Sequence, residues 1–367
     1  MRNIVAFLAA ELDAEPHFRS YTYRDLDDDP ICGWLYTFHL SKNETEEDLR
    51  RLARRMRRED VLYVNSAQPP QFMALINWVR SAGNRYPNVV IEFGTDPGIQ
   101  MDARGDLNIL SVQDMRSVLW RFAARHMPRD GIPRFHMVTF DPNVSRLYAR
   151  LLEQQVDVLP LPQVAQSQPI NRVGKRPVTI AVLGHQRSNK GYQLVPSVIR
   201  ILLEKEPNSR FLIHNPEPER WRATQQELRA FSSNNPRLVL DERVAGREIW
   251  HELLSRADLI LCPYDPVCFA ARYSAVAAEA IANGIPLVVP ATTTLSRLLF
   301  DHGEPGTTFA VQTPSVIADA VQQALAQFDL LADRAYRSAL QWGNSMGAAN
   351  MVGKMLEIVN PSVSKKS

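Results

Sequence analysis

Cysteine is scarce in this chain of 367 residues, which contains only three copies. An odd number excludes a fully paired disulfide framework, and Cys32, Cys262 and Cys268 lack the spacing of a zinc site. An excess of either charge is also missing, because 42 Lys and Arg residues face 40 Asp and Glu residues. The sequence therefore favours a reducing, cytoplasmic setting, and it gives no reason to expect a nucleic-acid partner or a metal cofactor.

Long hydrophobic runs are missing as well. The best candidate for a signal peptide, residues 4–10, follows Arg2, but it is too short to cross a bilayer, and Glu11 and Asp13 follow at once. We interpret it as a first buried strand. There is no low-complexity tract and no solenoid repeat, so we expect a globular chain of about two domains.

The first half of the chain alternates apolar runs of strand length with segments of helical periodicity. Strands are predicted at residues 3–8, 35–40, 61–65, 89–94, 134–140 and 156–160. Helices are predicted at residues 44–57, 70–82, 112–126 and 144–154. Short connections between these segments indicate an α/β domain built on a doubly wound, largely parallel sheet.

The same alternation returns in the second half. Strands are predicted at residues 178–183, 210–214, 238–240, 257–262, 286–289 and 308–311. Helices are predicted at residues 192–204, 220–232, 247–256, 275–283, 294–300 and 314–328, followed by a helical tail at 331–359. We therefore expect one domain over residues 1–163, a polar linker over 164–177, a second domain over 178–340, and a final helix with its tail over 341–367.

Residues 257–290, ADLILCPYDPVCFAARYSAVAAEAIANGIPLVVP, form the most informative stretch. They predict a strand, a loop, a helix capped by Ser274 and ended by Gly284, and a second strand. In a parallel sheet such a loop lies at the carboxyl edge, where a helix N-terminus offers free N–H groups to a phosphate. Glu279 is the one carboxylate on this apolar helix. Its burial predicts a partner, either a ligand hydroxyl or a protein donor.

A second strand, loop and helix start occupy residues 180–191, IAVLGHQRSNKG. Gly184 follows the strand, and Arg187 and Lys190 carry two positive charges into the loop. Two cations beside a backbone that can approach closely are suited to a diphosphate, because they offset the charge of a departing nucleotide. A solvated basic loop is the alternative interpretation of these residues.

Taken together, the two stretches resemble the donor-binding elements of the GT-B glycosyltransferases, in the large retaining family that includes sucrose synthase-like, glycogen synthase-like and lipopolysaccharide enzymes. The resemblance implies two Rossmann-like domains with a cleft between them and a C-terminal helix that crosses back to the first domain. It also implies that Glu279 holds the ribose of the nucleotide, and that Arg187 and Lys190 contact the donor phosphates. The family usually has another Glu eight residues before Glu279, where this chain has Ala271.

Tyr273 and Ser274 precede the helix of Glu279, and they are candidate contacts of the phosphate and the sugar. A simple N-cap role for Ser274 is an equal alternative. On the N-terminal side, His17 follows the first strand and is a candidate catalytic residue and acceptor contact, since its ordinary pKa lies near neutral pH. Asp96 follows the fourth predicted strand and is a second candidate acceptor contact. The glycine-rich loop that is usual after the first strand of the family is absent, which leaves this side less like the family.

A basic helix is predicted at residues 45–58. Its core face would consist of Leu49, Leu52, Ala53 and Met56, and its other faces would carry Arg50, Arg51, Arg54, Arg55, Arg57 and Arg58. These arginines form either a solvated face or a patch that binds anionic lipid at the inner face of a membrane.

From these features we expect a glycosyltransferase that moves a sugar, with retention, from a nucleotide sugar to a glycan or lipid-linked glycan in surface or exopolysaccharide synthesis. No metal or other cofactor is expected. Two other functions remain open: a non-catalytic protein that binds a nucleotide sugar or serves in assembly, and a sugar-nucleotide epimerase.

Overall fold

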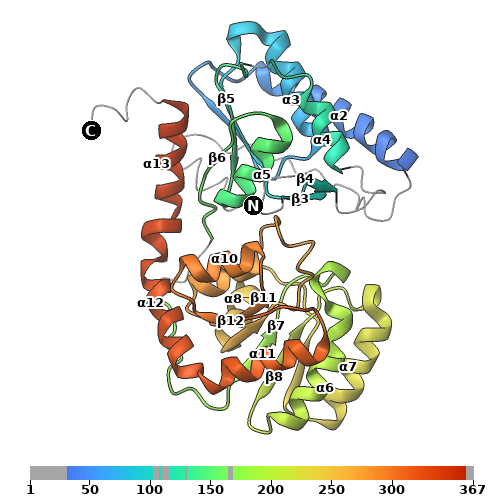
Figure 1. The fold of residues 1–367 in the computed structure, drawn as a ribbon, viewed down its shortest axis with the longest axis vertical. Coiled ribbons are helices and arrows are strands. Elements are labelled where there is room, and N and C mark those ends of the chain that lie inside the picture. The colour runs from blue at the N-terminus through green and yellow to red at the C-terminus, as the bar shows by residue number, and fades with distance from the viewer. Residues whose placement is uncertain (1–30, 102–106, 110–115, 129, 164–167, 361–367) are drawn as a thin grey trace. The chain divides into compact units, whose positions relative to one another are not determined.

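The computed structural model describes residues 31–101, 107–109, 116–128, 130–163 and 168–360 (Figure 1). The chain divides into two compact units. The first unit comprises residues 1–162 together with 346–367, and the second comprises residues 163–345. Each unit is built around its own parallel sheet, as expected for a chain of two Rossmann-like domains.

The first unit contains a four-stranded parallel sheet in the order β1-β2-β5-β6. Its strands are β1 (Val61–Val64), β2 (Asn88–Glu92), β5 (Phe135–Thr139) and β6 (Asp157–Val158). Its helices are α2 (Ile31–Ala53), α3 (Pro69–Ala82), the short η2 (Gly83–Arg85), α4 (Arg116–Ala124), α5 (Pro142–Leu152) and α13 (Ala348–Val359). A small antiparallel hairpin pairs β3 (Ile99–Met101) with β4 (Leu107–Ile109).

Both faces of this sheet are covered by apolar side chains. On one face Phe93, just after β2, packs in an aromatic cluster with Phe72 of α3, Trp120 of α4 and Tyr148 of α5. Side chains alternate along a strand, so Val90 of β2 points to the opposite face. There it joins a cluster with Val138, Leu159, Met351, Met355 and Val359. The C-terminal helix α13 therefore completes the core of the first unit.

Two sequence predictions for the first unit are wrong. Residues 35–40 are not a strand but part of α2, which begins at Ile31 and ends at Ala53 rather than near residue 57. The apolar run in this segment has strand length, and a run this short does not distinguish a strand from a buried helix. The hairpin of β3 and β4 was not predicted. The predicted first strand at residues 3–8 lies outside the described residues.

The second unit contains a six-stranded parallel sheet in the order β12-β11-β10-β7-β8-β9. The strands are β7 (Thr179–Val182), β8 (Arg210–His214), β9 (Leu238–Asp241), β10 (Leu259–Leu261), β11 (Leu287–Pro290) and β12 (Gly306–Phe309). The helices are α6 (Val195–Lys205), α7 (Arg222–Asn234), α8 (Arg247–Arg256), α9 (Ala275–Ala282), α10 (Thr294–Asp301), α11 (Pro314–Ala326) and α12 (Phe328–Met346). Short 3-10 turns η3 (Ser188–Lys190), η4 (Tyr192–Leu194) and η5 (Pro218–Trp221) precede α6 and α7.

The core of the second unit lies where α6 and α11 pack on the central strands. Val198 and Leu202 of α6 and Val321 of α11 are fully buried against Ile180 and Val182 of β7. The order of the strands reverses between β7 and β10, because the chain runs outward through β8 and β9 and then returns to start β10 on the other side of β7. The connections that leave the two strands diverge there, which makes the β7/β10 boundary the expected ligand position of this sheet.

The segment predicted as a linker is partly anchored to the second unit. Arg172 is 2% exposed, and its guanidinium donates hydrogen bonds to the carbonyl oxygens of Ala257, Asn283 and Gly284 at 2.9–3.2 Å. It also lies 3.8 Å from the Asp258 carboxylate. This buried cation fastens the segment before β7 to the end of α9 and the start of β10.

None of the described helices combines the length and the apolar character needed to cross a bilayer.

We predict that Met351→Ala destabilises the first unit, because Met351 of α13 is fully buried in the cluster with Val90 and Val138. Truncation of a buried methionine costs about 2–5 kcal/mol of unfolding free energy. Leu356→Ala in the same helix is the matched control, since Leu356 is 39% exposed, and it should cost less than about 1 kcal/mol. Urea unfolding of the full chain measures both. Equal effects of the two substitutions would show that α13 does not complete this core.

Candidate functional site

The first candidate element is the loop from Gly184 to Gly191, which leaves the carboxyl end of β7. Gly184 and Gly191 have φ angles of 97° and 68°, a left-handed region that favours glycine. A Cβ on Gly191 would lie 2.0 Å from the Pro263 carbonyl oxygen, which is closer than any side chain permits. The chain can therefore turn into α6 at this point only with glycine at position 191.

The second candidate element, the loop after β10, lies directly against the first. The Asp265 N–H donates to the Asn189 carbonyl oxygen at 2.9 Å. The loop after β10 is also held by the segment after β12, where the Gln312 amide donates to the Pro263 carbonyl oxygen at 2.8 Å. The structure thus brings together the two stretches that were singled out in the sequence, at the strand reversal between β7 and β10.

Lys190 lies at the centre of this contact. Its side chain is half-buried, and its ammonium nitrogen lies 5.4 Å from the centre of the Tyr264 ring. Burial lowers the pKa of Lys190 to about 8, Cys262 acts in the opposite direction, and the positive charges of Arg187 and Arg272 lower it further. Among the described residues Lys190 has no carboxylate partner, so this loop holds a positive charge that an anion can neutralise.

Arg272 is a further candidate residue of this site, which the sequence did not suggest. Its guanidinium lies over the Phe269 ring at 5.7 Å, and its charge acts on Lys190. Arg187 is exposed at the start of η3. The two predicted cations of the loop are therefore joined by a third, which the β10 loop contributes. In the sequence, the position of Arg272 next to Ala271 could have indicated it, because the family that the chain resembles usually has a Glu at position 271.

Glu279 lies on α9, and its burial has the expected consequence. Its Oε2 accepts a hydrogen bond from the Trp250 indole N–H at 2.6 Å, so the partner is a protein donor. Its Oε1 accepts none from a described residue. Burial raises the pKa of Glu279, and the bond from Trp250 works against that rise. One carboxylate oxygen is thus fixed by Trp250, and no other described residue donates a hydrogen bond to this carboxylate.

Ser274 and Tyr273 both have protein partners. The Ser274 hydroxyl accepts from the Ala277 N–H at 3.3 Å and caps α9, as one of the two interpretations had it. The Tyr273 hydroxyl accepts from the Gln163 amide at 2.8 Å. A contact of either residue with phosphate or sugar stays a prediction. Ala271 is buried, with 3% of its surface exposed.

On the N-terminal side, His17 lies outside the described residues. Asp96 is buried at the carboxyl edge of the first sheet, where it accepts from the Gly98 N–H at 2.9 Å and lies 3.4 Å from the Arg116 guanidinium. This ion pair gives Asp96 a structural partner, and an acceptor contact stays a prediction.

Glu92, at the end of β2, is a fully buried carboxyl group that the sequence analysis treated as part of a strand. Its Oε2 accepts from the Ser66 N–H at 2.8 Å, while its Oε1 has no hydrogen-bond partner in the described part of the chain. Burial raises the pKa of Glu92 to about 7, despite the bonds from Ser66. Its position inside an apolar run, VVIEFG, could have indicated a buried carboxyl group, as the apolar helix did for Glu279.

The arginines after residue 49 are exposed as expected, namely Arg50, Arg51, Arg54, Arg55, Arg57 and Arg58. Since α2 ends at Ala53, the last four follow the helix rather than lie on it. Leu49 is buried, whereas Ala53 is exposed and does not belong to the core face. Within the described ranges, no group of three or more His, Cys, Asp or Glu residues has an arrangement that could hold a metal ion.

Sequence comparison matches residues 177–327 to the family described as "Glycosyl transferases group 1". No curated protein sequence matches the chain. The matched segment runs from just before β7 to the end of α11, so it contains both loops of the candidate site.

Solved structures are similar over most of the chain. Sucrose-phosphate synthase of Thermosynechococcus elongatus gives a TM-score of 0.57 at 14% identity, over 84% of this chain and 74% of the other. A UDP-forming α,α-trehalose-phosphate synthase of Burkholderia vietnamiensis gives 0.62 at 13% identity, over 89% and 80%. WaaG, a glycosyltransferase involved in lipopolysaccharide biosynthesis, gives 0.52 at 17% identity, over 79% and 82%. These similarities confirm the expected fold.

We predict that Glu92 makes stability fall as pH rises. Its pKa in the folded state, about 7, lies above that of an unfolded Glu, so folding favours the protonated form. Between roughly pH 5 and pH 8 the parent should lose up to about 3 kcal/mol relative to Glu92→Gln, which stays neutral throughout. Urea unfolding of both proteins across this range measures the difference. A difference that does not vary with pH would contradict the assignment.

Proposed function

We propose that this chain is an enzyme that transfers a sugar, with retention, from a nucleotide-sugar donor bound at the β7/β10 boundary. The match of residues 177–327 to the group 1 glycosyltransferases and the shared fold of solved glycosyltransferases support the proposal. The observation that carries the proposal is the convergence of three cations and one partly buried carboxylate at this edge. The cations are Arg187, Lys190 and Arg272, and the carboxylate is Glu279.

The two kinds of charge suit the two ends of a nucleoside diphosphate. Oε1 of Glu279 would accept hydrogen bonds from the ribose hydroxyls, because Oε2 is already held by Trp250. The loop from Gly184 to Gly191 would carry the diphosphate, with backbone close at the glycines and the Lys190 ammonium above Tyr264. In this site Lys190 would neutralise charge that grows on the diphosphate as the sugar departs.

Retention is proposed through attack on the same face of the sugar, with the leaving phosphate assisting the acceptor hydroxyl. Such a reaction needs no carboxylate nucleophile from the protein. Its charge requirement is met by Arg187, Lys190 and Arg272, so we propose that no metal or other cofactor takes part. Ala271 contributes no charge near the sugar, which makes the three cations the main electrostatic contribution of the site.

On the acceptor side we propose a glycan or a lipid-linked glycan of surface or exopolysaccharide synthesis. His17 and Asp96 stay proposed contacts for it, and His17 is the proposed aid to the acceptor hydroxyl. The exposed Arg50, Arg54 and Arg58 support a peripheral contact with anionic lipid at the inner face of a membrane, where such an acceptor would be anchored.

A panel of UDP, GDP and ADP and their common sugars tests the proposal by thermal shift. A ligand that binds the folded state raises its stability by RT ln(1+[L]/Kd), so one nucleotide should raise the melting temperature above the others. Glu279→Ala should keep the fold, since alanine is suited to α9. It should lower the affinity for that nucleotide by about tenfold or more. Turnover of the labelled sugar should then require an acceptor. Conversion of the donor without an acceptor would indicate an epimerase, and binding without turnover a non-catalytic protein.

We predict that nucleotide affinity falls above about pH 8. The pKa of Lys190 is about 8 in the free protein, and a bound diphosphate favours the charged ammonium. Affinity should therefore fall only about twofold from pH 7 to 8 and then by up to about tenfold per pH unit. Calorimetric titration of the parent and of Lys190→Arg measures this, because arginine keeps its charge throughout. An affinity that is flat to pH 9.5 in the parent would exclude Lys190 from the phosphate site.

We also predict that Lys190→Gln lowers kcat more than it raises the KM of the donor. The charge of the diphosphate grows toward the transition state, so the lost ammonium matters more there than in the bound donor. Loss of one preorganised contact of this kind typically lowers the rate about 10²–10³-fold. Steady-state kinetics at saturating acceptor provide the measurement, with melting temperature as the control for folding. Transfer at the parental rate would refute the phosphate role.

A further inference from the structure

Trp250 lies on α8, between the two halves of the candidate site. Its indole N–H reaches Glu279 of α9, on one side of the strand reversal. On the other side, its ring edge lies 4.0 Å from the position that a Cβ on Gly184 would occupy, and its ring centre lies 6.3 Å from that of His214. One side chain therefore packs beside the proposed phosphate loop and at the same time holds the proposed ribose carboxylate.

His214 forms a second link to the phosphate loop. The Gly184 N–H donates to His214 Nδ1 at 3.3 Å, so the proton of the neutral ring is on Nε2, which lies 2.9 Å from the Arg243 carbonyl oxygen. Burial lowers the pKa of His214, which favours this neutral form. The ring is 1% exposed and is held at both nitrogens.

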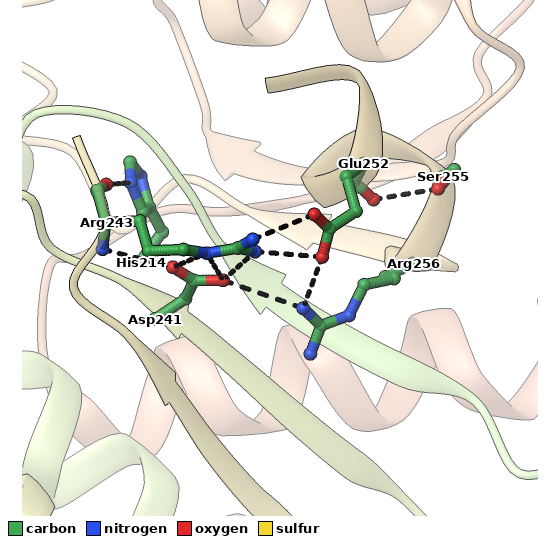
Figure 2. Close-up of polar contacts among 6 residues, drawn as sticks. All are labelled: His214, Asp241, Arg243, Glu252, Ser255 and Arg256. Carbon is green, nitrogen blue, oxygen red and sulfur yellow. Dashed lines mark hydrogen bonds and ion pairs between the residues drawn. The ribbon is translucent and has the colours of Figure 1, made fainter. Parts of the chain in front are cut away.

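The helix that carries Trp250 is itself fixed by ion pairs around Arg243 (Figure 2). The Arg243 guanidinium donates to Asp241, at the end of β9, at 2.6 Å, and to Glu252 of α8 at 2.8 Å. Arg256, one turn along α8 from Glu252, lies 3.2 Å from the same carboxylate and 3.6 Å from Asp241. A network of several charges with bidentate geometry orders its helix better than isolated surface pairs do.

From this arrangement we infer that Trp250 is a positioning residue of the donor site: it aligns Glu279 so that Oε1 faces the ribose, and it supports the Gly184 turn at the diphosphate. The inference rests on the proposed function. Without the indole donor, the Glu279 carboxylate could rotate and would lose its hydrogen-bond donor among the described residues. Both effects would weaken a well-oriented contact with a ribose.

The test compares ribonucleotides with their 2′-deoxy and 3′-deoxy forms, using UDP, GDP and ADP as probes. A carboxylate that is held against ribose hydroxyls gives the parent a preference for the ribonucleotide of about tenfold or more. Trp250→Phe keeps an aromatic ring and removes the N–H, and we expect this preference to shrink by about fivefold to tenfold. Trp342→Phe is the matched control in the same unit, because the Trp342 indole nitrogen has no hydrogen-bond partner in the described part of the chain. It should keep the parental preference.

A double-mutant cycle with Glu279→Gln distinguishes positioning from general destabilisation. If Trp250 acts through Glu279, the double variant should discriminate between ribose and deoxyribose no less than Glu279→Gln alone. Independent effects that add, or an unchanged preference in Trp250→Phe, would overturn the inference while leaving the proposed function intact. Failure of the parent to bind any of the three nucleotides would instead overturn the proposed function, and the inference with it.

A spectroscopic measurement covers the case in which Trp250→Phe does not fold. The chain has six tryptophans, and ¹⁵N labelling of their indoles reports each N–H separately. A bond to a carboxylate at 2.6 Å places the Trp250 proton downfield, and Glu279→Gln should move this one signal upfield. If no indole signal responds to Glu279→Gln, Trp250 does not hold Glu279 and the inference fails.

Discussion

The contact between the Gly191 backbone and the Pro263 carbonyl is the constraint on which the candidate site depends. Only a residue without a Cβ allows this approach, and the approach brings the loop after β7 onto the loop after β10. The two loops follow β7 and β10, which are neighbouring parallel strands. After β7 the chain continues to β8 on one side, and after β10 it continues to β11 on the other side. Lys190, Arg272 and Glu279 can therefore converge, although the chain returns to β10 only after passing through β8 and β9.

The electrostatics of the site follow from this packing. Lys190 packs over the Tyr264 ring and lies near the positive charges of Arg187 and Arg272. No carboxylate among the described residues neutralises its charge. Its lowered pKa expresses the cost of that arrangement. A folded protein tolerates such a cost where an anionic ligand offsets it, and the diphosphate of the proposed donor is such an anion.

The first unit has two buried carboxyl groups at the corresponding edge of its sheet. Glu92 and Asp96 are buried carboxyl groups within five residues of each other, and one of them has its pKa raised to about 7. The edge of the second sheet at the β7/β10 boundary gathers cations, whereas this edge of the first sheet carries acidic side chains.

The sequence by itself determined the alternation of strands and helices and the glycine that follows the end of α9. It also singled out Gly184, Arg187, Lys190 and Glu279, whose roles stay predictions. These depend on local chemistry, since periodicity, capping and glycine conformation act over a few residues. The same local signals failed at residues 35–40, where an apolar run of strand length belongs to a helix of 23 residues. Only the tertiary structure decided which groups meet across the chain. Trp250 reaches Glu279 over 29 positions, and Arg272 acts on Lys190 from another loop. These pairings arise because the parallel sheet brings segments that are distant in sequence to one edge. The spacing of residues within one segment cannot predict them.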